Sequence, residues 1–382
     1  MPNSRDFLRC SALAALLFTY IGFLLGAEEE LSIAAYLLCG AGVVIALVLF
    51  DVFSAIERLV QANETFWQVL MLAGTLALIA VFHQDHYTLF LIGTIFIYSV
   101  AVLGINVQLG YAGVINFSGA SFFGIGGYTA AVFLQNTSIP GSLTLPLGGL
   151  FAAVIGSLLL LPVLRTSGHY SALVTMAFAL LMKVFLEVSE WLGGPQGLSL
   201  PPLEFMGINF AEDIVIMGKE CSFYVKYDMV CLALLVLAFV FVRRVERSWM
   251  GLAMDAVRID ETAAACFGVN VTRWKITAFT MGNFVIGMAG ALYAMMLSYI
   301  NPSNFTFSDS LLFLSILLLG GIGSIWGVIA ATAFMVVIPE KFQVVQEYRY
   351  LIYSAMVLAM ILFRPSGLLP RKPRSYAMGG RS

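Results

Sequence analysis

Long apolar segments recur along the whole chain, and they constrain its fold more than any other feature. Segments close to the ~20 residues that a helix needs to cross a bilayer occupy about 10–26, 31–50, 66–82, 87–105, 118–135, 146–164, 171–191, 229–242, 274–296, 309–338 and 351–363. They lack the polar face of a helix on a soluble protein. The sequence therefore predicts an all-α fold, a polytopic integral membrane helical bundle with about 10–11 spans.

The charge content points the same way. Of the 382 residues, 11% are charged and 60% are hydrophobic, whereas soluble domains carry roughly a quarter charged residues. The formal net charge of −2 leaves no basic footprint for nucleic acid. Composition thus excludes a soluble enzyme and a nucleic-acid-binding protein.

Metal ligands and catalytic groups are scattered. The five cysteines form no CxxC motif. His83 and His86 flank Asp85, a group that could coordinate a metal but is more typical of a wet interfacial loop. These histidines and His169 form no catalytic grouping, and no GxxxxGK[ST] nucleotide-binding loop occurs. We expect no metal site, no bound cofactor and no enzymatic activity; if ATP drives this protein, the ATPase is another chain.

The distribution of Lys and Arg predicts the orientation. With a cytoplasmic N-terminus, and with 309–338 as a hairpin, the basic cluster at 243–275 and the basic C-terminal tail both lie inside. The motif GGIGSIWG interrupts 309–338 and predicts two short half-helices. The first span is expected to be a retained signal anchor, with a cleaved signal peptide as the alternative.

One long charged segment, RRVERSWMGLAMDAVRIDETAAACFGVNVTRWK at 243–275, stands among these apolar runs. Its apolar positions at helical spacing are Leu252, Ala256, Ile259, Ala263 and Phe267, and its polar positions are Asp255, Arg258, Glu261 and Thr262. Gly268 stands where a helix C-cap needs positive φ. The pattern predicts one short helix at about 252–268, at the cytoplasmic surface. Mixed charge and small side chains favour protein docking over binding to lipid headgroups.

A second group of polar residues adjoins a glycine-rich segment at 117–131. Its members are Asn106, Gln108, Asn116, Ser118, Ser121 and Tyr128. Small residues four apart, such as Gly127/Ala131 and Gly287/Ala291, favour close helix packing. Broken helices that present backbone dipoles to a zwitterionic solute are the alternative interpretation. We place the six polar residues on a substrate pathway.

Lys183 and Glu187 lie four apart within an apolar span. Intramembrane charges are expensive and usually face an interior or a cavity. Lys183 is therefore a candidate for the pathway, where it could meet a substrate carboxylate. A structural ion pair that fixes packing is the favoured alternative.

Several longer segments together resemble a known family. They are RSWMGLAMDAVRIDETAAACFGVNVTRWKITAFTMGNFVIGMAGALYA, NPSNFTFSDSLLFLSILLLGGIGSIWGVIAATA, LFRPSGLLPRK, GYAGVINFSGASFFGIGGYTAAVF and SGHYSALVTMAFALLMKVFLEVSEWLGGPQGL. The chain is similar to permease subunits of branched-chain amino-acid ABC importers, the LivH/LivM family, and most of all to the LivM type. The resemblance covers roughly 88–372, while the first 85 or so residues match loosely, as extra spans.

The resemblance implies a type-II-like ABC importer permease with broken half-helices, in a bacterial inner membrane. It divides the chain into N-terminal extra spans at 1–86, a permease core at 87–372 and a cytoplasmic tail at 373–382. The implied partners are a second, LivH-like permease, two P-loop ATPase subunits that use ATP and Mg, and a periplasmic or lipid-anchored solute-binding protein.

The charged segment then corresponds to the coupling helix that contacts the ATPase. Family members carry an EAAxxxG-like signature there; here Ala263, Ala264 and Gly268 match, but Thr262 stands in the place of the Glu and Glu261 lies one place early. The residues expected at the ATPase contact are Arg258, Asp260, Glu261, Ala263, Ala264 and Gly268. The expected solute is a branched-chain or other neutral amino acid. A urea or short-amide importer is the runner-up, and an ion-coupled transporter using Lys183 and Glu187 ranks below it.

Overall fold

The computed structural model describes residues 4–27, 32, 33, 35, 36, 39, 40, 63–137, 139–164, 170–201, 203–205, 208–210, 213–216, 219–341, 348–363, 367–369 and 371. The chain forms two compact units. The first comprises Met1–Ile92, Asp213–Val225 and Val337–Glu347, and the second comprises Gly93–Glu212, Lys226–Val336 and Tyr348–Ser382. Each is described by itself below.

The first unit is built on a pair of N-terminal helices. Helix α1 (Ser4–Gly26) packs against α4 (Glu64–Val81), and the rings of Phe7 and Phe66 meet edge to face at 4.7 Å. A small antiparallel hairpin, β4 (Ile214–Ile216) with β5 (Lys219–Cys221), belongs to the same unit. The predicted span at 31–50 lies largely outside the described residues.

Helix α5 (His86–Ile105) changes its winding as it ends. The Asp85 carboxylate accepts the backbone N–H of Tyr87 at 3.1 Å and of Thr88 at 3.3 Å, which starts the helix. At Asn106–Tyr111 the chain continues as a π-helix, η1. Such π-turns are rare and concentrate at functional sites.

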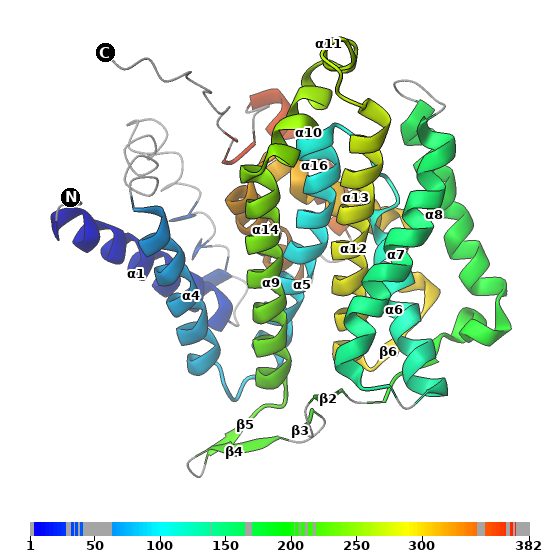
Figure 1. Ribbon diagram of the computed structural model, residues 1–382. Coiled ribbons are helices and arrows are strands. Elements are labelled where there is room, and N and C mark those ends of the chain that lie inside the picture. Colours follow the sequence, from blue (N-terminus) through cyan, green and yellow to red (C-terminus); the bar gives the residue numbers. More distant parts are fainter. Residues whose placement is uncertain are drawn as a thin grey trace, which may run out of the picture. The chain divides into compact units, whose positions relative to one another are not determined.

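The second unit is a helical bundle centred on α12 (Val271–Leu297), with the arrangement shown in Figure 1. Helix α12 packs along α6 (Gly119–Asn136) and α7 (Gly141–Leu164), while α8 (Tyr170–Val188) covers α7. A Cβ on Gly126 would lie 2.0 Å from the carbonyl oxygen of Gly287. The backbones therefore touch, so the small residues serve close packing, as their spacing predicted.

The remaining helices complete this bundle. They are α9 (Tyr224–Arg247), α10 (Trp249–Ile259), α11 (Glu261–Cys266), α13 (Phe307–Gly320), α14 (Ile325–Lys341) and α16 (Arg349–Phe363). Helices α13 and α14 are separated at residues 321–324, where Gly321 and Gly323 take φ of 107° and 87°. The predicted break of the long apolar run is confirmed there.

Short strands and 3-10 turns close the ends of the second unit. Strand β1 (Leu198–Ser199) pairs antiparallel with β6 (Tyr299–Ile300), and β2 (Glu204–Phe205) pairs with β3 (Ile208–Asn209). Single 3-10 turns occupy η2 (Glu190–Leu192), η3 (Gly194–Gln196) and η4 (Pro302–Asn304). All of these elements connect helices rather than form a layer of their own.

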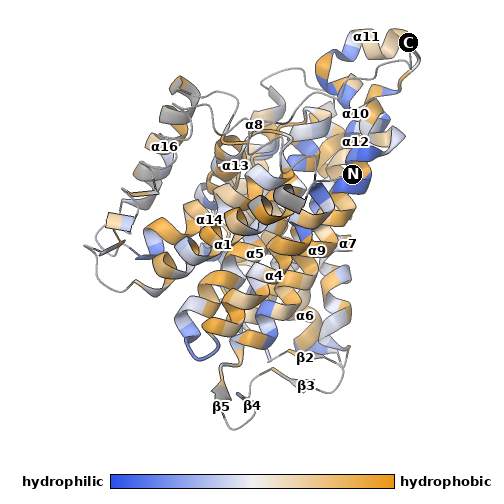
Figure 2. Cartoon of the chain, turned by 90° about the vertical axis from the view of Figure 1, so that its left-hand side faces the viewer, coloured by the Kyte–Doolittle hydropathy of each residue, from blue (hydrophilic) through white to orange (hydrophobic). Residues whose placement is uncertain are grey.

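Within the described residues, seven helices are long and apolar enough to cross a membrane. They begin at Glu64, His86, Gly141, Ser171, Tyr224, Val271 and Pro302. The predicted span at 118–135 corresponds to α6, which is not among them because its glycines and polar side chains make it less apolar. Figure 2 shows hydrophobic residues along the helix shafts and hydrophilic residues around α10 and the start of α12.

Candidate functional site

A fully buried group of amide and hydroxyl side chains lies inside the second unit, and we call it the polar core: Gln108, Asn116, Ser118 and Asn283. The Gln108 Nε2 atom donates to Asn283 Oδ1 at 2.8 Å, and Asn116 Nδ2 donates to Gln108 Oε1 at 2.8 Å. Asn116 Oδ1 in turn accepts from the backbone N–H of Ser118 at 2.8 Å and from its hydroxyl at 2.6 Å. Helix η1, helix α12 and the non-helical linker that precedes α6 are thereby tied together.

The backbone explains why these polar residues are inside. Between η1 and α6 the chain leaves the helical conformation at residues 113–118, so its N–H groups need partners other than helical carbonyls. Side chains supply them: the N–H of Phe117 donates to Thr175 Oγ1 at 3.1 Å, and Ser118 bonds to Asn116. The backbone is therefore broken between η1 and α6, directly before the glycine-rich segment.

Several buried polar atoms of η1, α6 and α12 have no hydrogen-bond partner in the described part of the chain. They are Asn106 Nδ2, Ser121 Oγ, Tyr128 Oη and Asn283 Nδ2. A Cβ on Gly156 of α7 would lie 2.1 Å from Asn283 Nδ2, so this amide faces a glycine that leaves it space. Buried donors without partners are uncommon in proteins, so these four groups remain free to form hydrogen bonds.

Of the seven predicted pathway residues, six are buried and Lys183 is the exception. Asn106 accepts from the N–H of Gly323. Gln108, Asn116 and Ser118 belong to the polar core. Ser121 and Tyr128 are buried further along α6. Lys183 lies on α8, 3.4 Å from Glu187, and both side chains are 39% exposed. The ion pair therefore forms on a partly exposed face of α8 instead of in the polar core.

Two residues of the interior were missed in the sequence. Asn283 accepts from Gln108 across 175 residues of chain, so no local pattern announces it. Asp228 is fully buried in α9, and its carboxylate lies against Gly93 of α5. A lone carboxylate inside an apolar helix is a signal that could have found Asp228, had the predicted span begun at 224 instead of 229.

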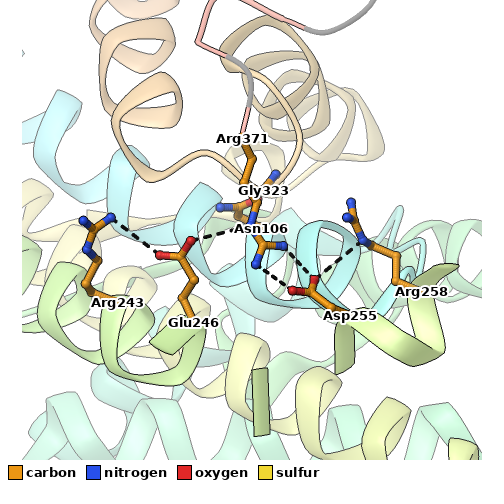
Figure 3. A network of polar contacts seen from close by, with 7 residues as sticks. All are labelled: Asn106, Arg243, Glu246, Asp255, Arg258, Gly323 and Arg371. Atoms are coloured by element: carbon orange, nitrogen blue, oxygen red, sulfur yellow. Dashed lines mark hydrogen bonds and ion pairs between the residues drawn. The ribbon is translucent and has the colours of Figure 1, made fainter. Parts of the chain in front are cut away.

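A charged cluster lies at the end of the bundle that carries α10, and Figure 3 shows it. Its members are Arg243, Glu246, Asp255, Arg258 and Arg371. Arg371 donates to both carboxylate oxygens of Asp255, at 2.7 and 2.8 Å. Burial alone would lower the pKa of Arg371, but the hydrogen bonds and negative charge of Asp255, with Tyr111 and Glu246 nearby, raise it above its ordinary value. The guanidinium is therefore a permanent cation.

The expected single helix at 252–268 is in fact two helices, α10 and α11. The backbone turns at Asp260 (φ −156°, ψ 110°), whose Oδ1 accepts the N–H groups of Thr262 and Ala263 at 2.8 and 2.9 Å. An aspartate that caps free N–H groups begins a new helix. The spacing of apolar residues stays helical across Asp260, so periodicity alone does not reveal the break. Gly268 ends α11 with φ +81°, as predicted.

The two helices bury one face and expose another. Gly251, Met254 and Val257 are buried on α10, while Ile259 is 79% exposed and Phe267, beside the α11 C-terminus, is 88% exposed. Most of the apolar stripe identified in the sequence, namely Leu252, Ile259, Ala263 and Phe267, is thus on the exposed side. Of the predicted contact residues, Arg258, Asp260, Glu261, Ala263 and Gly268 are exposed and Ala264 is buried.

A family model described as "Branched-chain amino acid transport system / permease component" matches residues 87–361. The chain belongs to this permease family. The LivM permease of Salmonella typhimurium, from a high-affinity branched-chain amino acid transport system, is 36% identical over 288 residues, which are 72% of this chain and 68% of that protein. Escherichia coli LivM is 35% identical over the same shares.

The second permease type of these systems is also similar. LivH of Salmonella typhimurium is 26% identical over 292 residues, covering 72% of this chain and 91% of that protein. No solved structure matches the permease. With its apolar helices, the family confirms the predicted fold class and a multi-pass location in the bacterial inner membrane.

Proposed function

We propose that this permease is a transmembrane subunit of an ATP-driven importer for branched-chain amino acids. A binding protein delivers the solute, a LivH-like permease completes the pathway, and separate P-loop ATPase chains that use ATP and Mg supply the energy. The names of the LivM and LivH relatives support the solute class and the pairing of two permeases. The sequence itself carries no nucleotide-binding loop.

The observation that carries this proposal is the exposed surface of α10 and α11. Ile259 and Phe267 present apolar side chains to the outside, next to the charged Asp260 and Glu261. Exposed aromatic and aliphatic groups ringed by charge are typical of a protein interface. Glu261 is held by Lys275 at 2.6 Å, so its side chain is oriented before any partner arrives. We assign this surface to the ATPase.

The polar core is the best candidate for the solute path. Its unpartnered amide, Asn283 Nδ2, can donate to a carboxylate, and the hydroxyls of Ser121 and Tyr128 can accept from an ammonium group. No ionised side chain belongs to the polar core, which fits weak, transient contact with a zwitterion. A urea or short-amide solute would use the same donors and acceptors and is the alternative.

Purification of the tagged permease from its native membrane tests the assignment, with partners identified by mass. The wild type should retain two P-loop ATPases, and Phe267→Asp should lose them because a charge enters an apolar contact. Tyr348→Asp, at another exposed aromatic residue, is the matched control and should keep them. Solute uptake by vesicles without ATP would contradict the proposal and favour an ion-coupled transporter. If Lys183→Gln then abolished this ATP-independent uptake, Lys183 would be assigned to ion coupling.

A further inference from the structure

Arg371, in the C-terminal segment, makes buried contacts that are not part of the exposed α10–α11 surface. Arg371 is only 10% exposed, and its guanidinium grips Asp255 of α10 through two parallel hydrogen bonds of 2.7 and 2.8 Å. Its Nε also lies 3.5 Å from Glu246 at the end of α9. A two-bond Arg–carboxylate pair is strong and fixes orientation as well as distance.

The segment before Arg371 is anchored to a different part of the bundle. The N–H groups of Leu368 and Leu369 donate to the carbonyls of Leu319 and Gly320, at 2.8 and 3.1 Å. These carbonyls belong to the last turn of α13, at its break from α14. We call residues 367–369 together with Arg371 the C-terminal latch; it joins the end of α13 to α10.

The same guanidinium also rests on the π-helix. It stacks 4.6 Å from the ring centre of Tyr111, and a Cβ on Gly323 would lie 2.7 Å from the Arg371 Cδ atom. The N–H of Gly323 donates to Asn106 Oδ1 at 2.8 Å, as Figure 3 shows. Arg371 therefore contacts η1 directly at one end and, through Gly323, at the other.

The π-helix leads from these contacts into the polar core. Gln108 lies between Asn106 and Tyr111, and its amide bonds to Asn283 and Asn116. A continuous set of contacts thus runs from α10, through Arg371 and η1, to the buried polar core. Arg243 and Arg258 make longer contacts, 3.6 Å to Glu246 and 3.8 Å to Asp255, and the Arg258 side chain lies against Gly113, just past the end of η1.

We propose that Arg371 is a positioning residue for energy coupling: it transmits displacement of α10 to the π-helix and hence to the polar core. This rests on the proposed docking of an ATPase at α10 and α11. Coupling between two sites is a free energy carried by an element that both sites bias. Arg371 is fixed to α10 by two hydrogen bonds and is stacked on η1. A displacement of α10 therefore displaces η1 as well.

The test uses the complete importer reconstituted in proteoliposomes, with ATP hydrolysis and leucine uptake measured in the same vesicles. The Arg371→Gln permease should still bind the ATPase subunits, and its basal rate of ATP hydrolysis should stay within about twofold of the wild type. The amount of leucine taken up per ATP hydrolysed should fall by roughly tenfold, within the usual range of coupling effects. Arg371→Lys keeps the charge without the paired geometry and should fall between. Arg273→Gln, at an exposed cation at the start of α12, is the control and should match the wild type.

A double variant separates coupling from general damage. If Arg371 acts through Asp255, the Arg371→Gln, Asp255→Asn pair should lose no more uptake per ATP than the worse single variant. The proposal for Arg371 would be refuted by unchanged uptake per ATP in Arg371→Gln or by additive losses in the double variant. It would also be refuted if both Arg371 variants released the ATPase. Uptake by the wild type without ATP would instead refute the proposed function, an ATP-driven importer, and is therefore distinguishable from failure of the Arg371 proposal.

Discussion

The contact between α6 and α12 makes a sharp prediction from two neighbouring glycines. A Cβ on Gly126 would lie 2.0 Å from the Gly287 carbonyl oxygen and 2.7 Å from its Cα, whereas a Cβ on Gly127 would lie 3.2 Å from its nearest atom, the Gly290 carbonyl oxygen. Both glycines sit inside α6, so both alanine substitutions gain about 1 kcal/mol of helix propensity. Gly126→Ala and Gly127→Ala therefore differ in the clash alone.

The size of the effect follows from the displacement that each substitution demands. At Gly126 the two backbones must separate by about 1.4 Å to reach an ordinary contact of 3.4 Å. Overpacking of this kind costs about 3 kcal/mol at the upper end of the usual range, because backbone atoms cannot rotate away. After the gain in propensity, Gly126→Ala should lose about 2 kcal/mol, while Gly127→Ala should be close to neutral.

Thermal unfolding of the two purified variants in detergent measures the difference. At about 1.2 °C per kcal/mol, from roughly 2.1 cal/mol/K of unfolding entropy per residue over a chain of this length, Gly126→Ala should melt roughly 2–3 °C below Gly127→Ala. Fluorescence and recovery of the monodisperse peak on size exclusion should agree. Equal melting temperatures for the two variants would refute the direct backbone contact between α6 and α12.

Further predictions concern the polar core and the α10–α11 surface. Asn283→Leu removes the acceptor of Gln108 and should lower solute uptake in vesicles by about tenfold, the usual scale of a lost buried hydrogen bond to a neutral group, with ATPase retention on purification unchanged. Asp260→Ala removes the cap of α11 at a cost of about 1 kcal/mol and should weaken retention of the ATPase. Asp260→Asn keeps a capping side chain and should retain the ATPase as the wild type does. Gly323→Ala strains a φ of +87° and collides with Arg371, so its uptake per ATP should fall as in Arg371→Gln.

The features that the sequence predicted correctly are those set by local chemistry. The apolar runs are long enough to span a bilayer, and that length fixes the membrane class. The glycines in GGIGSIWG end α13 because Gly321 and Gly323 adopt positive φ, a property of glycine itself. Gly268 closes α11 for the same reason. Gln108, Asn116 and Ser118 are neighbours in sequence, so their grouping could be predicted from their spacing.

The features that the sequence did not reveal depend on partners far along the chain or on which side of a helix is covered. Asn283 meets Gln108 across 175 residues, and Arg371 meets Asp255 across 116. Lys183 was placed in an apolar span correctly, but only the packing of α8 against its neighbours decides that its side chain is partly exposed. In the charged segment, the sequence supplied Asp260, which can cap a helix, and Gly268, which can end one. Tertiary packing decided that Met254 and Val257 turn inward while Phe267 stays outside, because burial is a property of neighbours that a single helix does not contain.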